Sequence, residues 1–200
     1  MPQIIYNMGY TATTAQLLTA PPYLMGAFAA IVVSHFSDRG KKRSPYIVGP
    51  QVVLVVAYSV LVAKAADFAS NVALCYVMVV IACMAVYPIV PGVSAWTINN
   101  LAGPEKRNMG SGYLITLGNC GGLIGSFIFF QHESPNYPTG FGTSLAFGAG
   151  GIVAVLLVSY LYYRHNRKYE HVSTEEVRAQ YSEQQLERMG DSSPLFKYTL

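Results

Sequence analysis

The chain has 200 residues, of which 52% are hydrophobic and only 12% are charged. Because soluble domains carry about 25% charged residues, this composition argues against an ordinary soluble domain and favours an integral membrane protein. The net charge of +3 is too small to indicate a nucleic-acid-binding protein. The three cysteines lie in apolar runs without the spacing of metal ligands, so we expect neither a disulfide framework nor a metal site.

A short charged loop near residue 40 separates two long uncharged runs. Residues 1–37 and 44–63 contain no Asp, Glu, Lys or Arg, whereas the loop between them holds four of the 13 Lys and Arg residues. A membrane-spanning helix needs about 20 apolar residues, and both flanks are long enough. Short loops rich in Lys and Arg face the cytoplasm. The pattern therefore predicts a cytoplasmic turn between two transmembrane helices.

The remaining apolar runs predict a transmembrane bundle over residues 1–163, followed by a cytoplasmic tail over residues 164–200. The expected spans are about 14–36, 45–63, 72–96, 109–130 and 141–163. Every Lys and Arg except Lys64 falls on one side of these spans. This asymmetry predicts that the N-terminus lies outside and the C-terminus lies in the cytoplasm.

Proline pairs interrupt two of the expected spans. We expect Pro21 and Pro22 to bend the first span, and Pro88 and Pro91 to break the second half of the third, because proline lacks a backbone donor. Inside a membrane such breaks persist only where protein or a water-filled cavity covers the freed groups.

The tail carries six basic and six acidic residues. Ser173 and Glu176 have the spacing of a capping box, which predicts a short helix that runs until Gly190. Its apolar periodicity is poor, which argues against a docked amphipathic helix. We therefore expect a partly ordered tail rather than a segment that binds a partner.

Asp38, Arg39 and Arg43 form an Asp-Arg-x-x-x-Arg motif in the charged loop. The motif resembles the loop between the second and third helices of each half of major facilitator superfamily transporters. Five spans with an outer N-terminus resemble helices 8 to 12 of that fold. The resemblance implies an all-α, polytopic helical bundle that forms an incomplete C-terminal half. It also implies that the N-terminal helices, which this chain lacks, are needed for function.

Longer stretches resemble fungal anion:cation symporters of the allantoate permease type. These stretches are residues 9–11, 16–23, 37–39, 96–103, 106–107, 118–125 and 135–140. The resemblance implies a plasma-membrane carrier of small organic anions such as allantoate, nicotinate or pantothenate, coupled to protons and working by alternating access. It implies no cofactor, and its partners would be the anion, the proton and the lipid bilayer.

Two other classes of function are weighed against transport. An intramembrane enzyme is disfavoured because no span carries a His/Glu metal pair, an Asp pair, or a serine with a possible base. A five-span adaptor or assembly subunit without transport activity remains the alternative.

Three polar side chains are candidates for a substrate cavity. Asn119 is an amide near the middle of the fourth span, where it would bond a neighbouring helix or donate to a substrate carboxylate. Tyr87 and Tyr23 follow or precede prolines, and each would line a cavity or pack in the core. Around Asn119, small residues at four-residue spacing predict close helix packing. They are Gly118, Gly121, Gly122 and Gly125.

Residues at the expected inner ends of the spans are assigned structural roles. We expect Trp96 to anchor at the membrane interface. Asn99 and Asn100 are expected to cap the helix end, and His35 to form a hydrogen bond near the loop rather than to relay protons. Asp38 and Arg39 in the charged loop are expected to stabilise one conformation through an ion pair or a helix-end contact.

Overall fold

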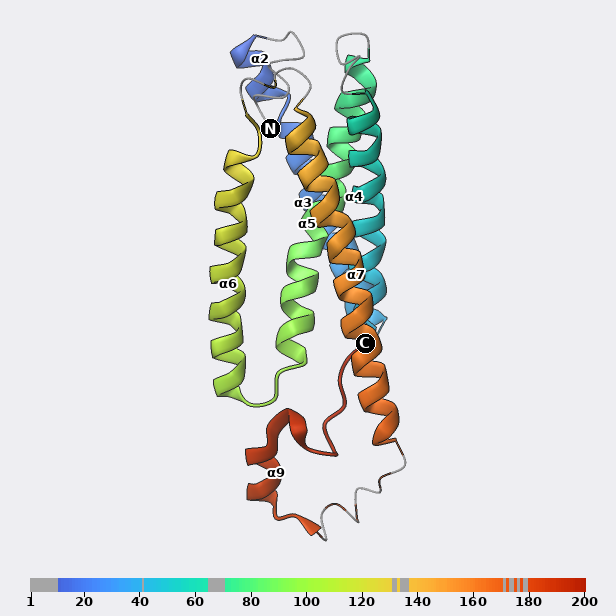
Figure 1. Ribbon diagram of the computed structural model, residues 1–200, viewed down its shortest axis with the longest axis vertical. Coiled ribbons are helices and arrows are strands. Elements are labelled where there is room, and N and C mark those ends of the chain that lie inside the picture. The colour runs from blue at the N-terminus through green and yellow to red at the C-terminus, as the bar shows by residue number, and fades with distance from the viewer. Residues whose placement is uncertain are drawn as a thin grey trace.

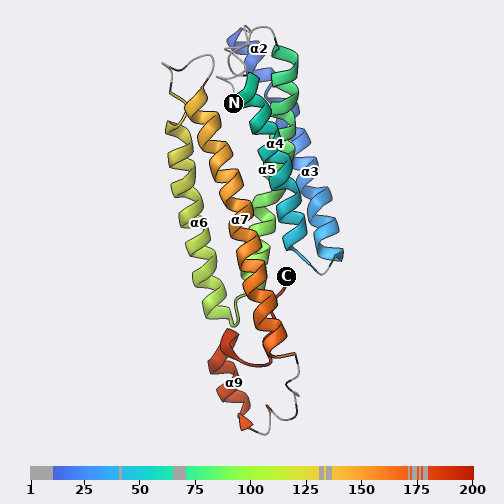
Figure 2. The same cartoon turned by 45° about the vertical axis from the view of Figure 1, so that its right-hand side comes forward.

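A computed structural model describes residues 11–200 apart from residues 41, 65–70, 131–132, 134–136, 171, 173–174, 176 and 178–179. Within these described residues all regular structure is helical, which confirms the expected all-α bundle. Long helices run side by side along the long axis (Figures 1 and 2). They are α3 (Ala20–Arg39), α4 (Ser44–Lys64), α5 (Val72–Asn99), α6 (Pro104–Phe127) and α7 (Pro138–Lys168). The short elements are α2 (Ala12–Leu17), α9 (Glu183–Met189) and the 3-10 helix η3 (Gly190–Ser192).

Four of the helical segments are long and apolar enough to cross a membrane. They are Thr13–Arg39, Ser44–Lys64, Val72–Asn99 and Pro138–Lys168. Helix α6 has 24 residues but is not among them, because glycines and Asn119 dilute its apolar residues. Its first turn also contains Glu105, Lys106 and Arg107. The sequence thus predicts five long helices correctly, although apolar length alone supports four spans.

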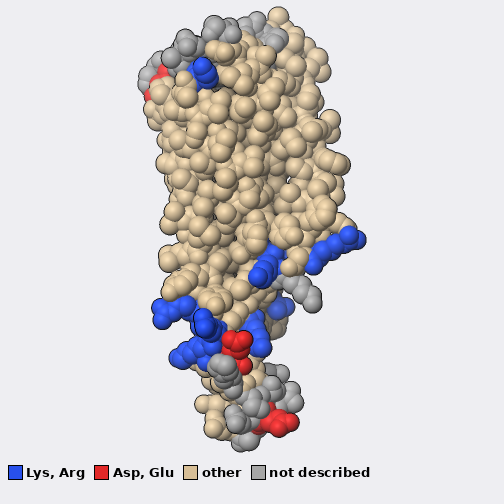
Figure 3. Space-filling view, turned by 90° about the vertical axis from the view of Figure 1, so that its right-hand side faces the viewer, with Lys and Arg blue, Asp and Glu red and all other residues tan. Residues whose placement is uncertain are grey.

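Charged residues gather at the two ends of the molecule and leave a band between them without charge (Figure 3). Most Lys and Arg side chains lie at the end where α3 and α5 finish and α4 and α6 begin. We call this the basic end, and the other the opposite end. Large apolar side chains such as Phe28, Ile31 and Val153 are exposed in the band, as lipid-facing residues are.

The proline pairs behave differently from the expectation. Pro21 and Pro22 lie in the first turn of α3, where a missing N–H breaks no helical bond, so they start a helix after a turn at residues 18–19. Pro88 and Pro91 lie inside α5, which continues to Asn99. The prediction that they break this span is wrong. Pro88 is fully buried, so protein covers the face of the helix on which this proline lies.

The tail also departs from the expectation. The predicted capping box at Ser173 and Glu176 lies outside the described residues. Instead, Ser182 and Gln185 form a capping box that begins α9, and this helix finishes before Gly190, as expected. Beyond it, residues 191–200 return to the basic end and pack there, so this segment is an ordered part of the tail.

Helix α5 holds the bundle together because α3 and α4 both pack against it, and α4 also packs against α7. The buried side chains form three clusters along these helices. Toward the opposite end the cluster is Leu61, Cys75, Val79, Tyr137 and Phe141, in the middle it is Leu54, Ala57, Ala82 and Ala85, and toward the basic end it is Ile47, Trp96 and Val155. The small residues of the middle cluster allow α4 and α5 to approach closely.

Gly151 of α7 makes a second close approach possible. A Cβ atom on Gly151 would lie 2.6 Å from Nε2 of Gln51, whose side chain is buried on α4. The neighbouring Gly150 is exposed, and a Cβ atom there would meet nothing within 4 Å. Glycine at position 151 therefore sets how closely α4 and α7 pack.

We expect Gly151→Val to force α4 away from α7 and to destabilise the bundle by about 1–3 kcal/mol, the usual cost of overpacking. Thermal unfolding in detergent would measure this as a lower midpoint temperature. Gly150→Val is the matched control and should leave the midpoint nearly unchanged. Equal losses in the two variants would contradict the packing assigned to Gly151.

Candidate functional site: an aromatic pocket and a charged loop

An aromatic pocket of about 250 Å³ lies between α3, α4, α5 and the start of α7. Its lining is almost wholly apolar, with three tyrosine hydroxyls as the main polar groups. The lining residues are Tyr23, Tyr58, Leu61, Val79, Ala82, Cys83, Val86, Tyr87, Phe129 and Phe141. Two of the three sequence candidates, Tyr23 and Tyr87, therefore share one pocket.

Tyr23 and Tyr87 form one wall of this pocket. Their ring centroids are 6.3 Å apart and the ring planes are inclined by 56°. Gly26, one turn after Tyr23 on α3, allows the approach, since a Cβ atom there would lie 2.8 Å from Cδ2 of Tyr87. The two tyrosines are 42% and 37% exposed, so they are lining residues that a ligand can reach rather than core residues.

The second wall consists of aromatic residues that the sequence analysis did not single out. Phe129 and Phe141 meet edge to face with centroids 5.7 Å apart, and Tyr58 lies 6.5 Å from Phe141. These residues lie on three separate segments, and no local sequence pattern distinguishes them from ordinary core aromatics. Together the two walls present aromatic faces to a flat apolar group and hydroxyls to a hydrogen-bonding group.

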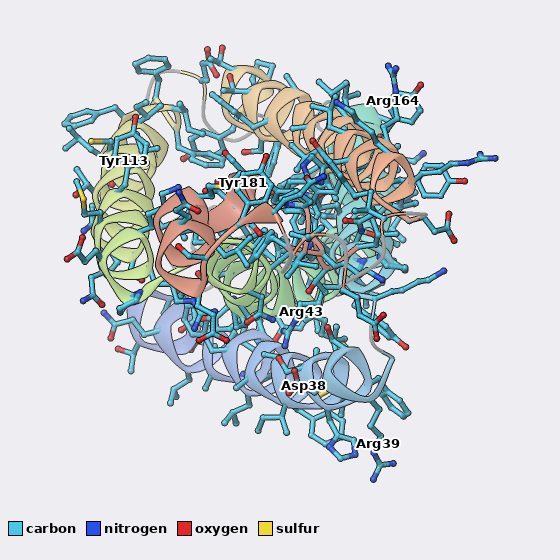
Figure 4. All side chains as sticks on the ribbon, turned by 90° about the horizontal axis from the view of Figure 1, so that it is seen from below. Asp38, Arg39, Arg43, Tyr113, Arg164 and Tyr181 are labelled. Atoms are coloured by element: carbon cyan, nitrogen blue, oxygen red, sulfur yellow. The ribbon has the colours of Figure 1, made fainter. Side chains whose placement is uncertain are left out.

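The charged loop forms a second feature, at the basic end. Nη2 of Arg43 lies 3.0 Å from Oδ1 of Asp38. These two side chains point toward one another across the loop, whereas Arg39 points away from the bundle (Figure 4). The expected ion pair is thus formed by Asp38 with Arg43, and not with Arg39. Tyr46 packs on the loop, because a Cβ atom on Gly40 would lie 2.8 Å from its ring.

Arg43 also connects the loop to α5. In the orientation that satisfies its amide, the Asn99 oxygen accepts from Nε of Arg43 at 2.9 Å. The Arg43 side chain is 20% exposed and that of Asp38 is 65% exposed. Such a partly hydrated ion pair stabilises the conformation in which it is formed by at most about 1 kcal/mol, so it is able to break and re-form.

Behind this pair lies a pocket of about 220 Å³ that reaches from α3 to the proline-containing part of α5. Ser37 and Pro88 are its buried lining residues. The charged loop and the proline-containing segment of α5, where backbone donors are missing, therefore line the same pocket.

Asn119 and the glycines of α6 are not brought into either pocket. None of the described residues of α6 is buried. A Cβ atom added at any of the four glycines would meet nothing within 4 Å among the described residues, and these are Gly118, Gly121, Gly122 and Gly125. The predicted packing of this face remains a prediction, and its partner would lie outside the described chain.

The residues at the end of α5 lie deeper than expected. Trp96 is buried among the helices of the bundle, and its placement at a membrane interface remains a prediction. Asn100 caps the helix as predicted, since its Nδ2 donates to the Trp96 carbonyl at 3.0 Å. His35 is exposed, with its ring against Phe36. Within the described ranges, no group of three or more His, Cys, Asp or Glu residues is placed to hold a metal ion.

Comparisons with known proteins agree on one family. The family model of the Major Facilitator Superfamily matches residues 1–196. The MFS-type transporter cnsO of Penicillium expansum is 31% identical over 100% of this chain and 39% of its own length. The high-affinity nicotinic acid transporter of Saccharomyces cerevisiae is 29% identical over 99% of this chain and 36% of its own length. The major facilitator-type transporter hxnP of Emericella nidulans is 26% identical over 100% of this chain and 40% of its own length.

No solved structure matches the chain. The chain spans about two-fifths of the length of these curated relatives. The alignments cover almost all of this chain. The Asp-Arg loop, the helical bundle and the match of the family model agree, and the chain belongs to the major facilitator superfamily.

Proposed function

We propose that the chain supplies the C-terminal part of a carrier, not an enzyme, that moves small organic anions across the plasma membrane together with protons, by alternating access. Membership of a transporter family and likeness to a nicotinic acid transporter support the general activity. The likeness of its sequence stretches to allantoate permease-type symporters supports the anion class. The observation that carries the proposal is the aromatic pocket between α3, α4 and α5.

The pocket suits a flat, single-ring anion. At about 250 Å³ it is smaller than sites that hold drug-sized ligands. Stacking of a ring on Tyr23 or Tyr87 is worth about 0.5–1.5 kcal/mol beyond the area that it buries. The tyrosine hydroxyls are able to donate to a carboxylate. A pyridine carboxylate such as nicotinate combines these two features.

The pocket is also incomplete for this task. No charged residue is among its lining residues, and an anion in an apolar environment needs a positive or strongly donating partner. Proton coupling needs a titratable group within the membrane. We assign both to helices outside this chain, which would close the exposed side of Tyr23 and Tyr87 and pack on the glycine face of α6.

The basic end is assigned to the cytoplasm. It carries the charged loop, the start of α6 and residues 164–168, and clusters of Lys and Arg beside spans remain on the cytoplasmic side. The aromatic pocket then opens in the outer half of the bundle. In this orientation the Asp38–Arg43 pair would stabilise the state in which the cytoplasmic end is closed.

Removing an aromatic wall should weaken substrate binding. We expect Tyr87→Ala in the complete carrier to raise the KM for nicotinate uptake about 5- to 10-fold, because the variant loses one stacking contact with the ring of the substrate. Tyr113→Ala is the matched control, because Tyr113 lies on α6, is 69% exposed and lines neither pocket. Uptake of labelled nicotinate would measure both. The proposed site is wrong if the KM is unchanged in Tyr87→Ala.

Breaking the loop ion pair should slow the carrier without removing it from the membrane. We expect Asp38→Asn to lower the maximum uptake rate several-fold, because Arg43 loses its carboxylate partner in the closed state. Arg39→Gln should have a much smaller effect, since Arg39 points away from the bundle. Uptake normalised to surface expression distinguishes the two. Equal rates in both variants would contradict a role for the pair.

The 200-residue chain alone should insert into membranes but should not transport. The described spans contain no acidic or basic residue near their middle, so neither the anion nor the proton has a charged partner. Reconstituted vesicles that hold only this chain would test this expectation with labelled organic anions at several pH values. Saturable, pH-dependent uptake would refute the need for further helices. If the chain neither transports labelled nicotinate nor binds it more weakly after Tyr87→Ala, an adaptor would be favoured instead.

A further inference from the structure

Residues Asp191–Leu200, which we call the strap, return from the tail to the basic end of the bundle (Figure 1). Two asparagines on separate helices bind its backbone. Asn166 of α7 accepts from the Tyr198 N–H at 2.9 Å and donates to the Tyr198 carbonyl at 2.7 Å. Asn100, at the end of α5, accepts from the Thr199 N–H at 2.7 Å and donates to the Thr199 carbonyl at 3.1 Å.

This arrangement resembles the pairing of a β-strand with a neighbour. Each side-chain amide offers one acceptor and one donor, and each satisfies both backbone groups of a single residue. Trp96 adds a third contact, because its Nε1 donates to the Thr199 carbonyl at 2.8 Å. Trp96, Asn100 and Asn166 thus form a cradle that recognises extended backbone.

An aromatic stack holds the strap beside this cradle. The Tyr198 ring lies parallel to that of Tyr162, with centroids 4.4 Å apart and planes inclined by 8°. His165 and Phe196 meet the same ring edge to face, at 4.8 Å and 5.0 Å. Tyr162 in turn meets Trp96 at 5.6 Å. Backbone recognition and ring stacking therefore converge on Tyr198 and Thr199.

The strap also contacts the other elements of the basic end. The Arg43 N–H of the charged loop donates to the Leu200 carbonyl, and Lys106 of α6 pairs with Asp191. The hydrogen bond from Lys106 lowers the pKa of the Asp191 carboxyl, with His165 adding a smaller electrostatic effect. A carboxyl with a lowered pKa stays ionised at neutral pH, and the pair is lost only when the pH falls through that lowered value. The Lys106–Asp191 pair is therefore formed at neutral pH, where the strap is tested below.

We propose that the cradle is an intramolecular peptide-binding site, and that the strap docked in it holds the basic ends of α5 and α7 and the charged loop in one arrangement. Undocking of the strap frees these ends to move apart. The proposal does not depend on the substrate, because the cradle lies at the end of the bundle away from the aromatic pocket and contacts backbone only.

Hydrogen exchange at neutral pH on the complete polypeptide in lipid nanodiscs tests the proposal. The amides of Tyr198 and Thr199 should be protected. Asn166→Leu keeps the size of the side chain but removes both of its bonds, and it should speed exchange at Tyr198 by about 10-fold or more. It should also speed exchange at Thr199, whose own acceptor Asn100 is intact, because the strap undocks as a unit. The matched control is Asn108→Leu, an exposed asparagine of α6.

The double variant Asn100→Leu with Asn166→Leu should in addition speed exchange in the last turns of α5 and α7, while residues 72–85 of α5 keep their protection and report intact folding. The strap assignment is overturned if Tyr198 and Thr199 exchange like an unstructured peptide in the unsubstituted protein. It is also overturned if Asn166→Leu affects Tyr198 alone. Unchanged helix ends in the double variant would show that the strap docks without holding them.

Discussion

Lipid offers no hydrogen-bond partner to a peptide group, so each backbone N–H and C=O within the bilayer must be satisfied by the protein itself. This constraint explains why the described chain is built from long helices and why α5 is central. Pro88 removes one donor from α5, and the helix remains continuous there because neighbouring helices bury it. Farther along, the hydroxyls of Ser94 and Thr97 donate to carbonyls one turn earlier. The same requirement continues at its last turn, where Asn100 satisfies the Trp96 carbonyl.

The sequence allowed the bundle and the charged loop to be predicted, because apolar length and the placement of Lys and Arg are local signals. The partners of single residues were harder to predict. For Tyr23 and Tyr87 the sequence is compatible with either a cavity or a core position, because the close approach at Gly26 that brings them into one pocket is a tertiary contact. Asn166 was missed altogether. Its bonds to Tyr198 join residues 32 positions apart, and the bonds of Asn100 to Thr199 join residues 99 positions apart. No periodicity in the sequence indicates such distant pairs.

The bundle has one packed side and one open side. The clusters of α4, α5 and α7 are buried to a degree typical of a core, whereas no described residue of α6 is buried. Tyr23 and Tyr87 are exposed on α3 and α5 although they line a pocket. This asymmetry fits a chain that spans about two-fifths of its relatives. It also explains why glycines at packing spacing on α6 contact nothing in the described chain.

The cradle of Trp96, Asn100 and Asn166 contacts the backbone of Tyr198 and Thr199. Contacts of this kind are indifferent to most side chains. Substitutions at Lys197 or Thr199 would therefore be nearly neutral during evolution, whereas changes at the two asparagines would be selected against. Related carriers would thus keep a docked segment while most of its sequence, apart from the stacked ring of Tyr198, diverges. In such proteins the two asparagines and this one aromatic position, rather than the rest of the segment, would be recognisable in the sequence.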